Sequence, residues 1–167
     1  MGTADGLRAV VGEPTDPEML AALLPDHDVV ISCIGQRGRG DAGILRQSAS
    51  AMVRAIGGAP APAFLVLSQG LLFQSRNPLV LLVKRILSRH VDDSLAMEVA
   101  LRASDVDWTI VRPPRLRDGG RRRGYRIAVN ERPSGPASMQ RADLAAFLLD
   151  EAETRQHSRQ VVGVTSA

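Results

Sequence analysis

Residues 101–114 read LRASDVDWTIVRPP and contain the clearest change of local pattern in the chain. The first part ends a helical pattern that reaches Ala103, and the second part is an apolar, β-branched run of strand length from Val106 to Arg112. Pro113 and Pro114 end the strand, because proline has no N–H to donate to a sheet. The stretch therefore predicts a helix that leads into a strand, which is the repeating unit of an α/β fold.

The same alternation extends toward the N-terminus. Asp28 to Ile34 is a continuous apolar run, typical of a strand that is buried on both faces in the middle of a parallel sheet, and Ala63 to Ser68 is a further strand. Apolar positions between Ile44 and Ile56 mark one face of a helix. A helical region from Leu79 to Ala103 is expected to bend near His90. Alternating strands and helices predict an α/β, doubly wound parallel sheet.

Weaker patterns flank this centre. Leu7 to Gly12 is a short strand-like run, and Asp16-Pro17-Glu18 is a strong helix start for a helix that ends at Leu24. Further along, we expect an exposed strand at Tyr125 to Val129, a helix from Asp143 to Glu153 and a last strand at Gln160 to Val164. No linker or internal repeat divides the chain, so residues 1–167 are predicted to form a single domain.

The composition is ordinary for a globular protein, with 44% hydrophobic and 23% charged residues. No apolar stretch reaches the roughly 18 residues that span a bilayer, and no secretory signal pattern opens the chain. The single cysteine, Cys33, excludes an internal disulfide and fits a reducing compartment. We therefore expect a cytoplasmic protein with no membrane partner and, because no Cys/His spacing fits one, no metal site.

The sequence pI near 9.9 rests almost entirely on arginine, and Lys84 is the only lysine. Eight arginines lie between Arg112 and Arg132. Proteins that bind single-stranded nucleic acid usually combine such charge with stacking aromatic residues, but Tyr125 is the only aromatic residue nearby. We therefore expect no nucleic-acid partner; a solvated basic loop is favoured, and a contact with an anion or a cofactor phosphate is the alternative.

Residues 101–114 also resemble the "LRASGLDWTIVRP" stretch of atypical short-chain dehydrogenases/reductases. More narrowly, the chain resembles the NAD(P)H-binding group that includes NmrA-like proteins and the biliverdin-IXβ and flavin reductases. Supporting pieces follow in the expected order over roughly 145 residues. They are Val10 to Glu13, Val30 to Gly35, Leu67-Ser68 and Arg141 to Ala145. The resemblance implies a Rossmann-like fold, NAD or NADP as cofactor, and a small-molecule acceptor such as a flavin.

Residue by residue, the resemblance implies a site at the carboxyl ends of the strands, where ligands of open α/β sheets bind. Ser68 is the predicted catalytic residue and would face the nicotinamide and substrate, with Pro113 and Pro114 forming a wall. The remaining predicted cofactor contacts are Glu13 near the adenine, Gly35 at a close backbone approach, Arg37 on a phosphate oxygen, and Arg112. On the residues alone, Gly35 and the prolines could instead be turn formers, and Ser68 a hydrogen-bonded strand cap.

The chain departs from the acid–base chemistry of ordinary short-chain dehydrogenases. Those enzymes use a tyrosine and, four residues later, a lysine. The corresponding positions here hold Val91 and Leu95, and Ser94 stands where some relatives have a histidine. Glu98 is predicted to be a solvated helix residue in preference to an acid catalyst. Flavin-reductase-like relatives manage without the pair, because hydride passes directly to an electron-poor acceptor.

A second departure lies at the start of the chain. The resemblance places a strand, a phosphate-binding glycine turn and a helix before Leu7, where only Met1 to Gly6 stand. The expected fold is thus a Rossmann-like sheet lacking the first βαβ unit, with Val29 to Ile34 exposing an apolar edge. The loop from Gly35 to Gly40 lacks the G-x-G-x-x-G spacing and is a weak substitute for the missing pyrophosphate cradle.

Three explanations for this N-terminally incomplete domain stay open: a start that lies too late, a decayed remnant, or a domain that binds partners without a cofactor. We expect weak or absent NADPH binding by this chain. Two functions follow. One is an NAD(P)H-dependent reductase of flavins or similar conjugated acceptors, impaired in this chain. The other is a non-catalytic, NmrA-like dinucleotide-sensing or protein-interaction module.

Overall fold

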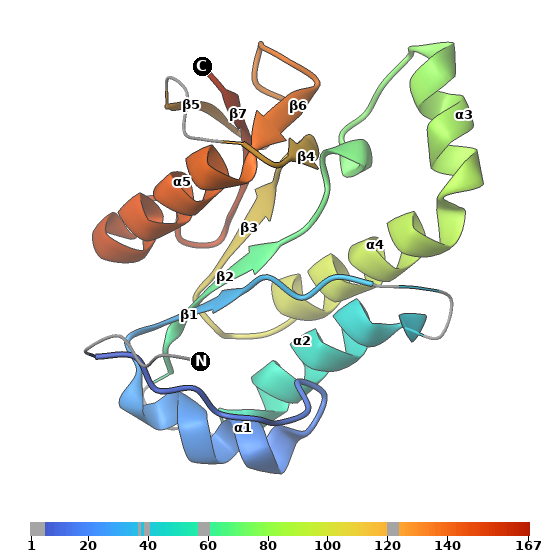
Figure 1. Cartoon of the computed structure of the whole chain (residues 1–167). Helices are drawn as coiled ribbons and strands as arrows, with labels where there is room; N and C mark the ends of the chain where they lie inside the picture. The colour runs from blue at the N-terminus through green and yellow to red at the C-terminus, as the bar shows by residue number, and fades with distance from the viewer. Residues whose placement is uncertain (1–5, 37, 39–40, 57–60, 120–123) are drawn as a thin grey trace.

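The computed structural model describes residues 6–36, 38, 41–56, 61–119 and 124–167, and within them five strands form a central sheet (Figure 1). The strands lie in the order β1-β2-β3-β7-β5. The first four are parallel, and β5 runs antiparallel to β7. Their bounds are Val29–Ser32 for β1, Ala63–Leu67 for β2, Trp108–Arg112 for β3, Gln160–Ser166 for β7 and Tyr125–Val129 for β5.

Helices cover both faces of this sheet (Figure 1). On one face lie α1 (Pro17–Leu23), α2 (Ile44–Ala55) and α4 (Ser88–Arg102), and α5 (Arg141–Thr154) lies on the other. A third helix, α3 (Pro78–Ile86), projects away from the sheet. Short elements complete the chain: the 3-10 helices η1 (Leu24–Asp26) and η3 (Gly70–Leu72), and a small parallel sheet of β4 (Arg115–Arg117) and β6 (Ser138–Gln140).

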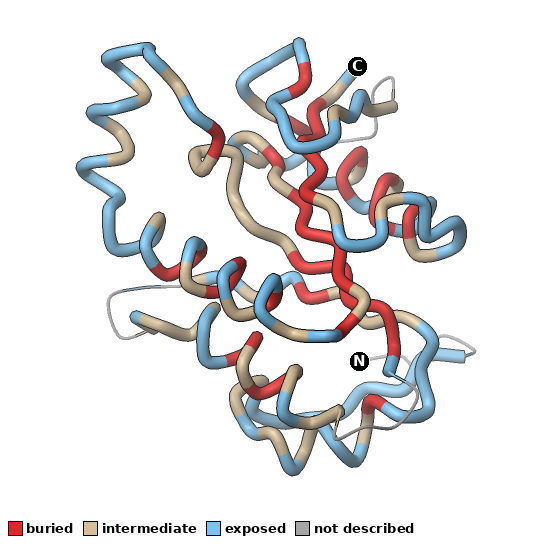
Figure 2. Tube along the Cα trace, turned by 180° about the vertical axis from the view of Figure 1, so that it is seen from behind, coloured by how far each residue is buried: buried red, intermediate tan, exposed pale blue. Residues whose placement is uncertain are grey.

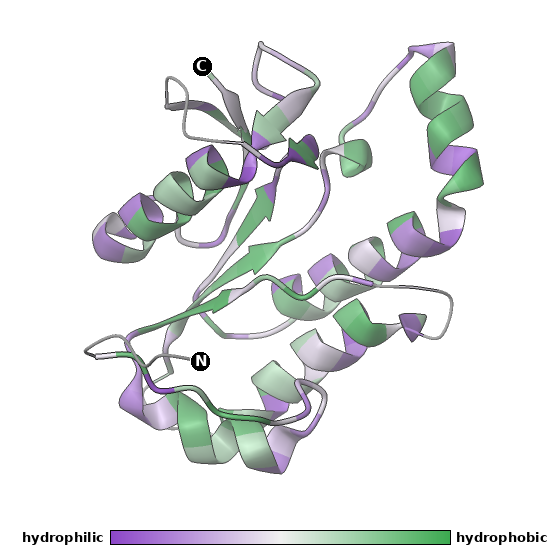
Figure 3. Cartoon of the chain, in the orientation of Figure 1, coloured by the Kyte–Doolittle hydropathy of each residue, from purple (hydrophilic) through white to green (hydrophobic). Residues whose placement is uncertain are grey.

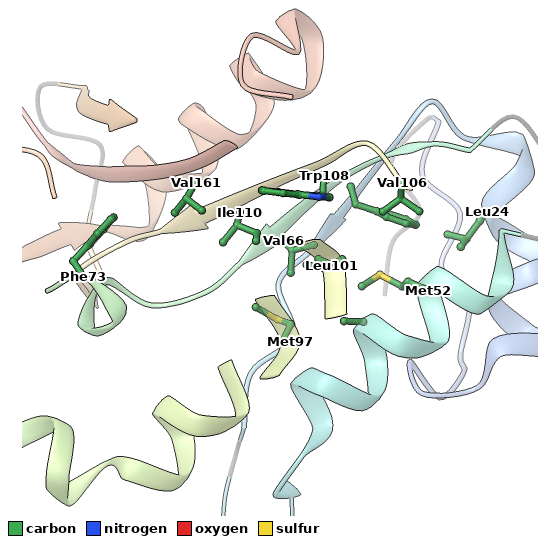
Figure 4. Close-up of a cluster of buried hydrophobic side chains, with 12 residues drawn as sticks. Leu24, Met52, Val66, Phe73, Met97, Leu101, Val106, Trp108, Ile110 and Val161 are labelled. Carbon is green, nitrogen blue, oxygen red and sulfur yellow. The ribbon is translucent and has the colours of Figure 1, made fainter. Parts of the chain in front are cut away.

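Two apolar cores lie on opposite sides of the sheet, because successive strand residues point to opposite faces. Phe64, Val66 and Ile110 point toward α2 and α4, where they join Met52, Met97 and Leu101 (Figure 4). Leu65 and Val111 point the other way and pack against Phe147 and Leu148 of α5. The predicted α/β fold with a doubly wound, mostly parallel sheet is confirmed.

The hydropathy of the chain matches its burial in the sheet but not in α3. The central strands β2, β3 and β7 are strongly apolar and almost entirely buried (Figures 2 and 3). Helix α3 is also strongly apolar, yet it contains no buried residue, and Leu79 and Ile86 are 67% and 71% exposed. In the part of the chain that the structure describes, no helix is long and apolar enough to cross a membrane.

The predicted strand from Leu7 to Gly12 is wrong. Residues 7–13 form no strand, and Val11 is fully exposed at 102%. A strand needs a partner for its backbone groups, and none of the described strands pairs with this segment. The expectation that Val29 to Ile34 lies in the middle of the sheet is also wrong. Strand β1 is shorter and stands at the edge of the sheet, with only β2 as a described neighbour. This position agrees with the other expectation from the sequence, that Val29 to Ile34 exposes an edge.

Other predicted elements are confirmed with small shifts of their bounds. Asp16 caps α1, because its carboxylate accepts hydrogen bonds from the N–H groups of Glu18 and Met19 at 2.9 and 3.3 Å. The bend expected near His90 is a break at Leu87, where φ and ψ of −97° and 19° leave the helical range. The three-residue strands β4 and β6 were missed, since such short segments carry no periodic signal.

Candidate functional site

The carboxyl ends of β2 and β3 continue as two paired loops. The N–H of Ser68 donates to the carbonyl of Val111, and the N–H of Gly70 donates to the carbonyl of Pro113, both at 2.8 Å. A Cβ at Gly70 would lie only 2.9 Å from that Pro113 oxygen, so the approach of the two chains requires glycine. The pairing places Ser68 beside the end of β3 and fixes the direction in which Pro113 and Pro114 leave the sheet.

A buried carboxylate, Glu98 of α4, joins these strand ends. Its side chain is 0% exposed, and Arg112 contacts it twice, through Nε at 2.9 Å and Nη2 at 2.6 Å. Arg102 adds a third contact at 2.7 Å, and the Ser68 hydroxyl donates to Glu98 Oε1 at 2.6 Å. Two guanidinium groups around one carboxylate leave this cluster with a net positive charge, and the bidentate pair holds the guanidinium of Arg112 in place.

The prediction that Glu98 is solvated is therefore wrong. The signal that could have found it is periodicity: Asp93, Ser94, Met97, Glu98 and Leu101 are the buried residues of α4. These positions recur at intervals of three or four residues and form one helical face. Glu98 follows Met97 directly on that face, which is the face that packs on the sheet.

A pocket of about 460 Å³ opens at these same strand ends. This volume lies within the usual range for small-molecule sites, about 300–1,000 Å³. Its walls are mainly apolar and come from η3 and the loop after it, α3, the end of β3, residues 132–137 and β7, and its described lining includes Phe73, Val80, Val83, Leu87, Pro113, Pro114 and Val164. One face of α3 thus forms a wall of the pocket although the helix stands away from the sheet.

The structure brings some of the predicted site residues together and separates others. Arg112, Pro113 and Pro114 line the pocket, and Ser68 precedes the lining residue Gln69. Gly35 and Glu13 are exposed and line neither this pocket nor a second, more open one beside α2. A Cβ at Gly35 would meet no described atom within 4 Å. Arg37 lies outside the described residues.

The amino terminus of α2 is the described helix start that follows β1. Gly38, Gly40 and Gly43 have the G-x-G-x-x-G spacing just before this helix, a signal that the sequence reasoning missed by ending the loop at Gly40. The N–H groups of Leu45 and Arg46 each donate to the carboxylate of Asp93 at 3.2 Å. Asp93, which is 7% exposed, thus occupies the place where a helix start would otherwise bind a phosphate.

The single tyrosine and the single lysine have other partners, as the sequence predicts. The Tyr125 hydroxyl donates to Asp150 of α5 at 2.6 Å, and neither residue belongs to the described pocket lining. The Lys84 ammonium donates to the carbonyl of Phe73 at 2.8 Å and so ties α3 to the loop after η3. The two side chains come from separate elements, β5 and α3, and donate to different groups, so they do not form the adjacent Tyr/Lys pair of ordinary short-chain dehydrogenases. Among the described residues, no group of His, Cys, Asp and Glu could hold a metal ion.

The pocket side of this site fits the nicotinamide end of a dinucleotide. Apolar walls at the carboxyl ends of parallel strands can cover a flat ring, and Gly70 permits the close backbone approach that shapes them. The β1 side fits the diphosphate less well, because the described helix amides there already bind Asp93.

Comparisons with known proteins agree with this geometry. The family model described as NAD(P)H-binding matches residues 2–155. Searching curated proteins gives no match. The fold is similar to that of SP1627 from Streptococcus pneumoniae TIGR4, a candidate NADH-flavin reductase, with a TM-score of 0.75 and 21% identity over 89% of this chain and 78% of that one.

Two further solved structures have the same fold. ChuY, an anaerobillin reductase from Escherichia coli O157:H7, has a TM-score of 0.73 and 21% identity over 93% of this chain and 73% of that one. A short-chain dehydrogenase/reductase from Veillonella parvula DSM 2008, solved with NADP, has a TM-score of 0.72 and 18% identity over 93% of this chain and 70% of that one. The family match covers most of the sequence, and NAD(P) is the cofactor of that family. The chain therefore belongs to the NAD(P)H-binding family, as residues 101–114 predict, and it has a Rossmann-like fold.

Proposed function

We propose that the pocket at the carboxyl ends of β2 and β3 binds a flavin or a similar conjugated acceptor, which is reduced by hydride from NAD(P)H. The observation that carries this proposal is the apolar pocket itself, which includes Phe73, Pro113 and Pro114 and lies where α/β sheets bind their ligands. Similarity in fold to a candidate NADH-flavin reductase and to an anaerobillin reductase supports this class of acceptor. Bound NAD(P)H supplies the hydride.

The pocket walls orient the acceptor and exclude water from the face that receives hydride. Taking up a hydride adds negative charge to the conjugated ring. The Arg112 guanidinium lines the pocket and stabilises that charge without having to move, because Glu98 holds it from behind. Solvent supplies the proton that completes the reduction, so no protein acid is required.

Ser68 acts in this proposal as a positioning residue. Its hydroxyl proton is committed to Glu98, at 2.6 Å, so that proton is not available to the acceptor. The hydroxyl ties the end of β2 to the same carboxylate that holds Arg112. Both alternatives from the sequence, a strand cap and a group facing the nicotinamide, remain compatible with this bond, and Ser68→Ala separates them by its effect on the KM for NADPH.

The reductase activity of this chain is proposed to be limited by its hold on the cofactor diphosphate. The helix amides after β1 are used by Asp93, and the coil of residues 7–13 is exposed. We expect a high KM for NADPH together with ordinary affinity for the acceptor.

The second candidate function is a non-catalytic dinucleotide-sensing or protein-interaction module. The observation that favours it is that Tyr125 and Lys84 come from separate elements, β5 and α3, and donate to different groups, so they do not form the Tyr/Lys pair of ordinary short-chain dehydrogenases. The two candidates differ in one measurable property, because only a reductase oxidises NADPH in the presence of a free acceptor.

The test is NADPH oxidation at high cofactor concentration with riboflavin and FMN as acceptors. Ala137→Trp fills the pocket from an exposed lining position, and we expect it to lower kcat/KM for the acceptor by about tenfold or more. Ala145→Trp, at an exposed position of α5 outside the lining, is the matched control and should retain the activity. Absence of oxidation by the unmodified chain, or equal activity of both variants, would overturn the proposal.

A further inference from the structure

Three arginines line the apolar pocket, and its described lining contains no acidic residue. We propose that the pocket selects conjugated acceptors that carry an anionic substituent, a phosphate or a carboxylate, and that Arg115 and Arg132 bind this substituent at the rim. The inference deepens the proposed function and rests on it. Its physical basis is that two of the three guanidinium groups lack an internal counter-charge.

Arg112 is the arginine that already has an internal acidic partner, Glu98, which it shares with Arg102. Its side chain is 11% exposed, it forms a bidentate pair with Glu98, and its guanidinium lies over the ring of Phe73 at 4.8 Å from the ring centroid. These contacts fix it as part of the inner wall, next to the ring of a bound acceptor. It is therefore a poor candidate for a substituent that extends toward solvent.

Arg115 lies on β4, immediately after the two prolines that end β3. Strand β4 pairs with β6, with Arg115 opposite Ser138, so its backbone position is set by a sheet and not by a free loop. The residue is exposed, and the structure gives its side chain no hydrogen bond or ion pair with another described residue. Its guanidinium is therefore available to a ligand.

Arg132 is the third arginine of the lining, and it belongs to a loop that is anchored to β7. The N–H of Asn130 donates to the carbonyl of Val161 at 2.7 Å, and the Thr165 hydroxyl donates to the carbonyl of Pro136 at 2.8 Å. Gly163 of β7 allows this loop to pack closely, because a Cβ there would lie 2.6 Å from Cδ of Pro133 and even nearer to the carbonyl of Glu131. Arg132 is exposed, and within the described residues its side chain has no bonded partner either.

The rim is thus built from two separately anchored elements that each present an unpaired guanidinium. A phosphate or carboxylate placed between them gains charge-assisted hydrogen bonds and loses little hydration, since the rim is open to solvent. Because exposed pairs of this kind are individually weak, two of them predict a preference of about tenfold for an anionic acceptor over its neutral analogue. The preference should fall with added salt.

FMN and riboflavin are the probes, because they share the ring system and differ by one phosphate. Quenching of flavin fluorescence by the unmodified chain should give a Kd about tenfold lower for FMN at low ionic strength. In the double variant Arg115→Gln/Arg132→Gln, the Kd for FMN should rise to that for riboflavin, while riboflavin binding is retained. The control, Arg8→Gln/Arg126→Gln, removes the same charge from exposed arginines outside the pocket and should keep the preference.

The outcomes separate this inference from the function on which it rests. Equal affinities for FMN and riboflavin in the unmodified chain would overturn the anion subsite and leave the reductase proposal standing. Failure to bind either flavin would overturn both. A third arm compares NADPH with NADH: if the rim variant weakens NADPH and leaves FMN unchanged, the arginines serve the cofactor phosphate and the inference is wrong.

Discussion

Two regions along the carboxyl edge of the sheet, the ends of β2 and β3 and the side of β1, differ in how many contacts hold their side chains and backbone in place. At the ends of β2 and β3, a buried Glu98 ties Ser68, Arg102 and Arg112 together, and an apolar pocket follows. On the β1 side, residues 7–13 are exposed coil, β1 has one described neighbour, and the helix start that follows it is occupied by Asp93. The pocket side is held in place by buried charged contacts, whereas on the β1 side two N–H groups at the start of α2 already donate to Asp93.

Because of this difference, the residues that show the family and the residues expected to bind the cofactor diphosphate lie in different regions of the chain. The stretch that resembles the family, residues 101–114, belongs to the pocket side, at the ends of β2 and β3, and contributes Arg112, Pro113 and Pro114 to the pocket lining. The features that bind a diphosphate in such folds, free helix amides behind a glycine turn, belong to the other side. Binding of an acceptor and binding of NAD(P)H are therefore expected to respond to different substitutions.

The largest expected effect comes from removing Glu98. In Glu98→Ala the guanidinium of Arg112, 11% exposed, loses its bidentate partner, and breaking a buried pair costs about 3–5 kcal/mol of unfolding free energy. Urea denaturation checks this. Asp118→Ala removes the exposed pair with Arg141 and is the control, with no measurable change expected. A loss for Glu98→Ala no larger than for the control would mean that the cluster does not stabilise the pocket side.

A matched pair of isoleucines compares the two sides of the sheet directly. Ile110 of β3 is 0% exposed, whereas Ile31 of β1 is only half-buried at the edge. Ile110→Ala should cost about 2–5 kcal/mol of unfolding free energy, and Ile31→Ala clearly less, because fewer contacts are lost around a side chain that keeps part of its solvent shell. Chemical denaturation of both variants measures the difference, and equal losses would contradict the looser packing of β1.

A matched pair of glycines compares the sides in ligand binding. In Gly163→Ala the new methyl group collides with Pro133, at 2.6 Å, so the loop that carries Arg132 must shift, at a cost of about 1–3 kcal/mol, and FMN binding weakens. Gly35→Ala has open space and should leave stability unchanged. If NAD(P)H contacts the backbone of Gly35, as the family resemblance implies, Gly35→Ala should raise the KM for NADPH and leave FMN binding unchanged.

An unchanged KM for NADPH in Gly35→Ala would leave Gly35 as a turn former. Unimpaired FMN binding in Gly163→Ala would mean that the loop of residues 130–137 does not shape the pocket.

The smallest expected effect concerns Cys33, which follows β1 directly. The residue is exposed, yet burial of its thiol raises the pKa of that thiol. A raised pKa means less thiolate at a given pH, so alkylation should be slower than for a free thiol at pH 8 and should rise with pH beyond the range where a free thiol levels off. A pH series of alkylation rates measures this; a rate like that of a free peptide thiol would show that the end of β1 is more open.

The sequence predicted the parts of the fold that depend on local pattern. Local pattern was enough to predict the strands that begin near Ala63 and Trp108 and the helices that alternate with them. The sequence also shows directly that Tyr125 and Lys84 lack the spacing of a Tyr/Lys pair. The errors share one cause, which is that they depend on non-local partners. Leu7 to Gly12 has strand composition but no described strand to pair with, and β1 reads as central although it stands at an edge.

The site residues divide in the same way. Pro113, Pro114 and Arg112 line a pocket because they stand at the end of a strand, which is a local feature, and their contacts with the cofactor stay predictions. Glu98 was misjudged although its position marks the buried face of α4, because its bidentate partner Arg112 lies 14 residues away in sequence. Arg132 reaches the pocket through a loop folded onto β7, a contact that composition cannot reveal. The roles of Glu13, Gly35 and Arg37 toward the cofactor stay predictions.

The most direct test of the contrast between the two sides is a pair of titrations on the same folded chain, one with FMN and one with NADPH, under identical salt conditions. The preorganised pocket predicts saturable FMN binding with a Kd at least about tenfold lower than that for NADPH, since the helix amides after β1 already bind Asp93. Tighter binding of NADPH than of FMN would contradict the account, because it would require a working diphosphate site on the β1 side.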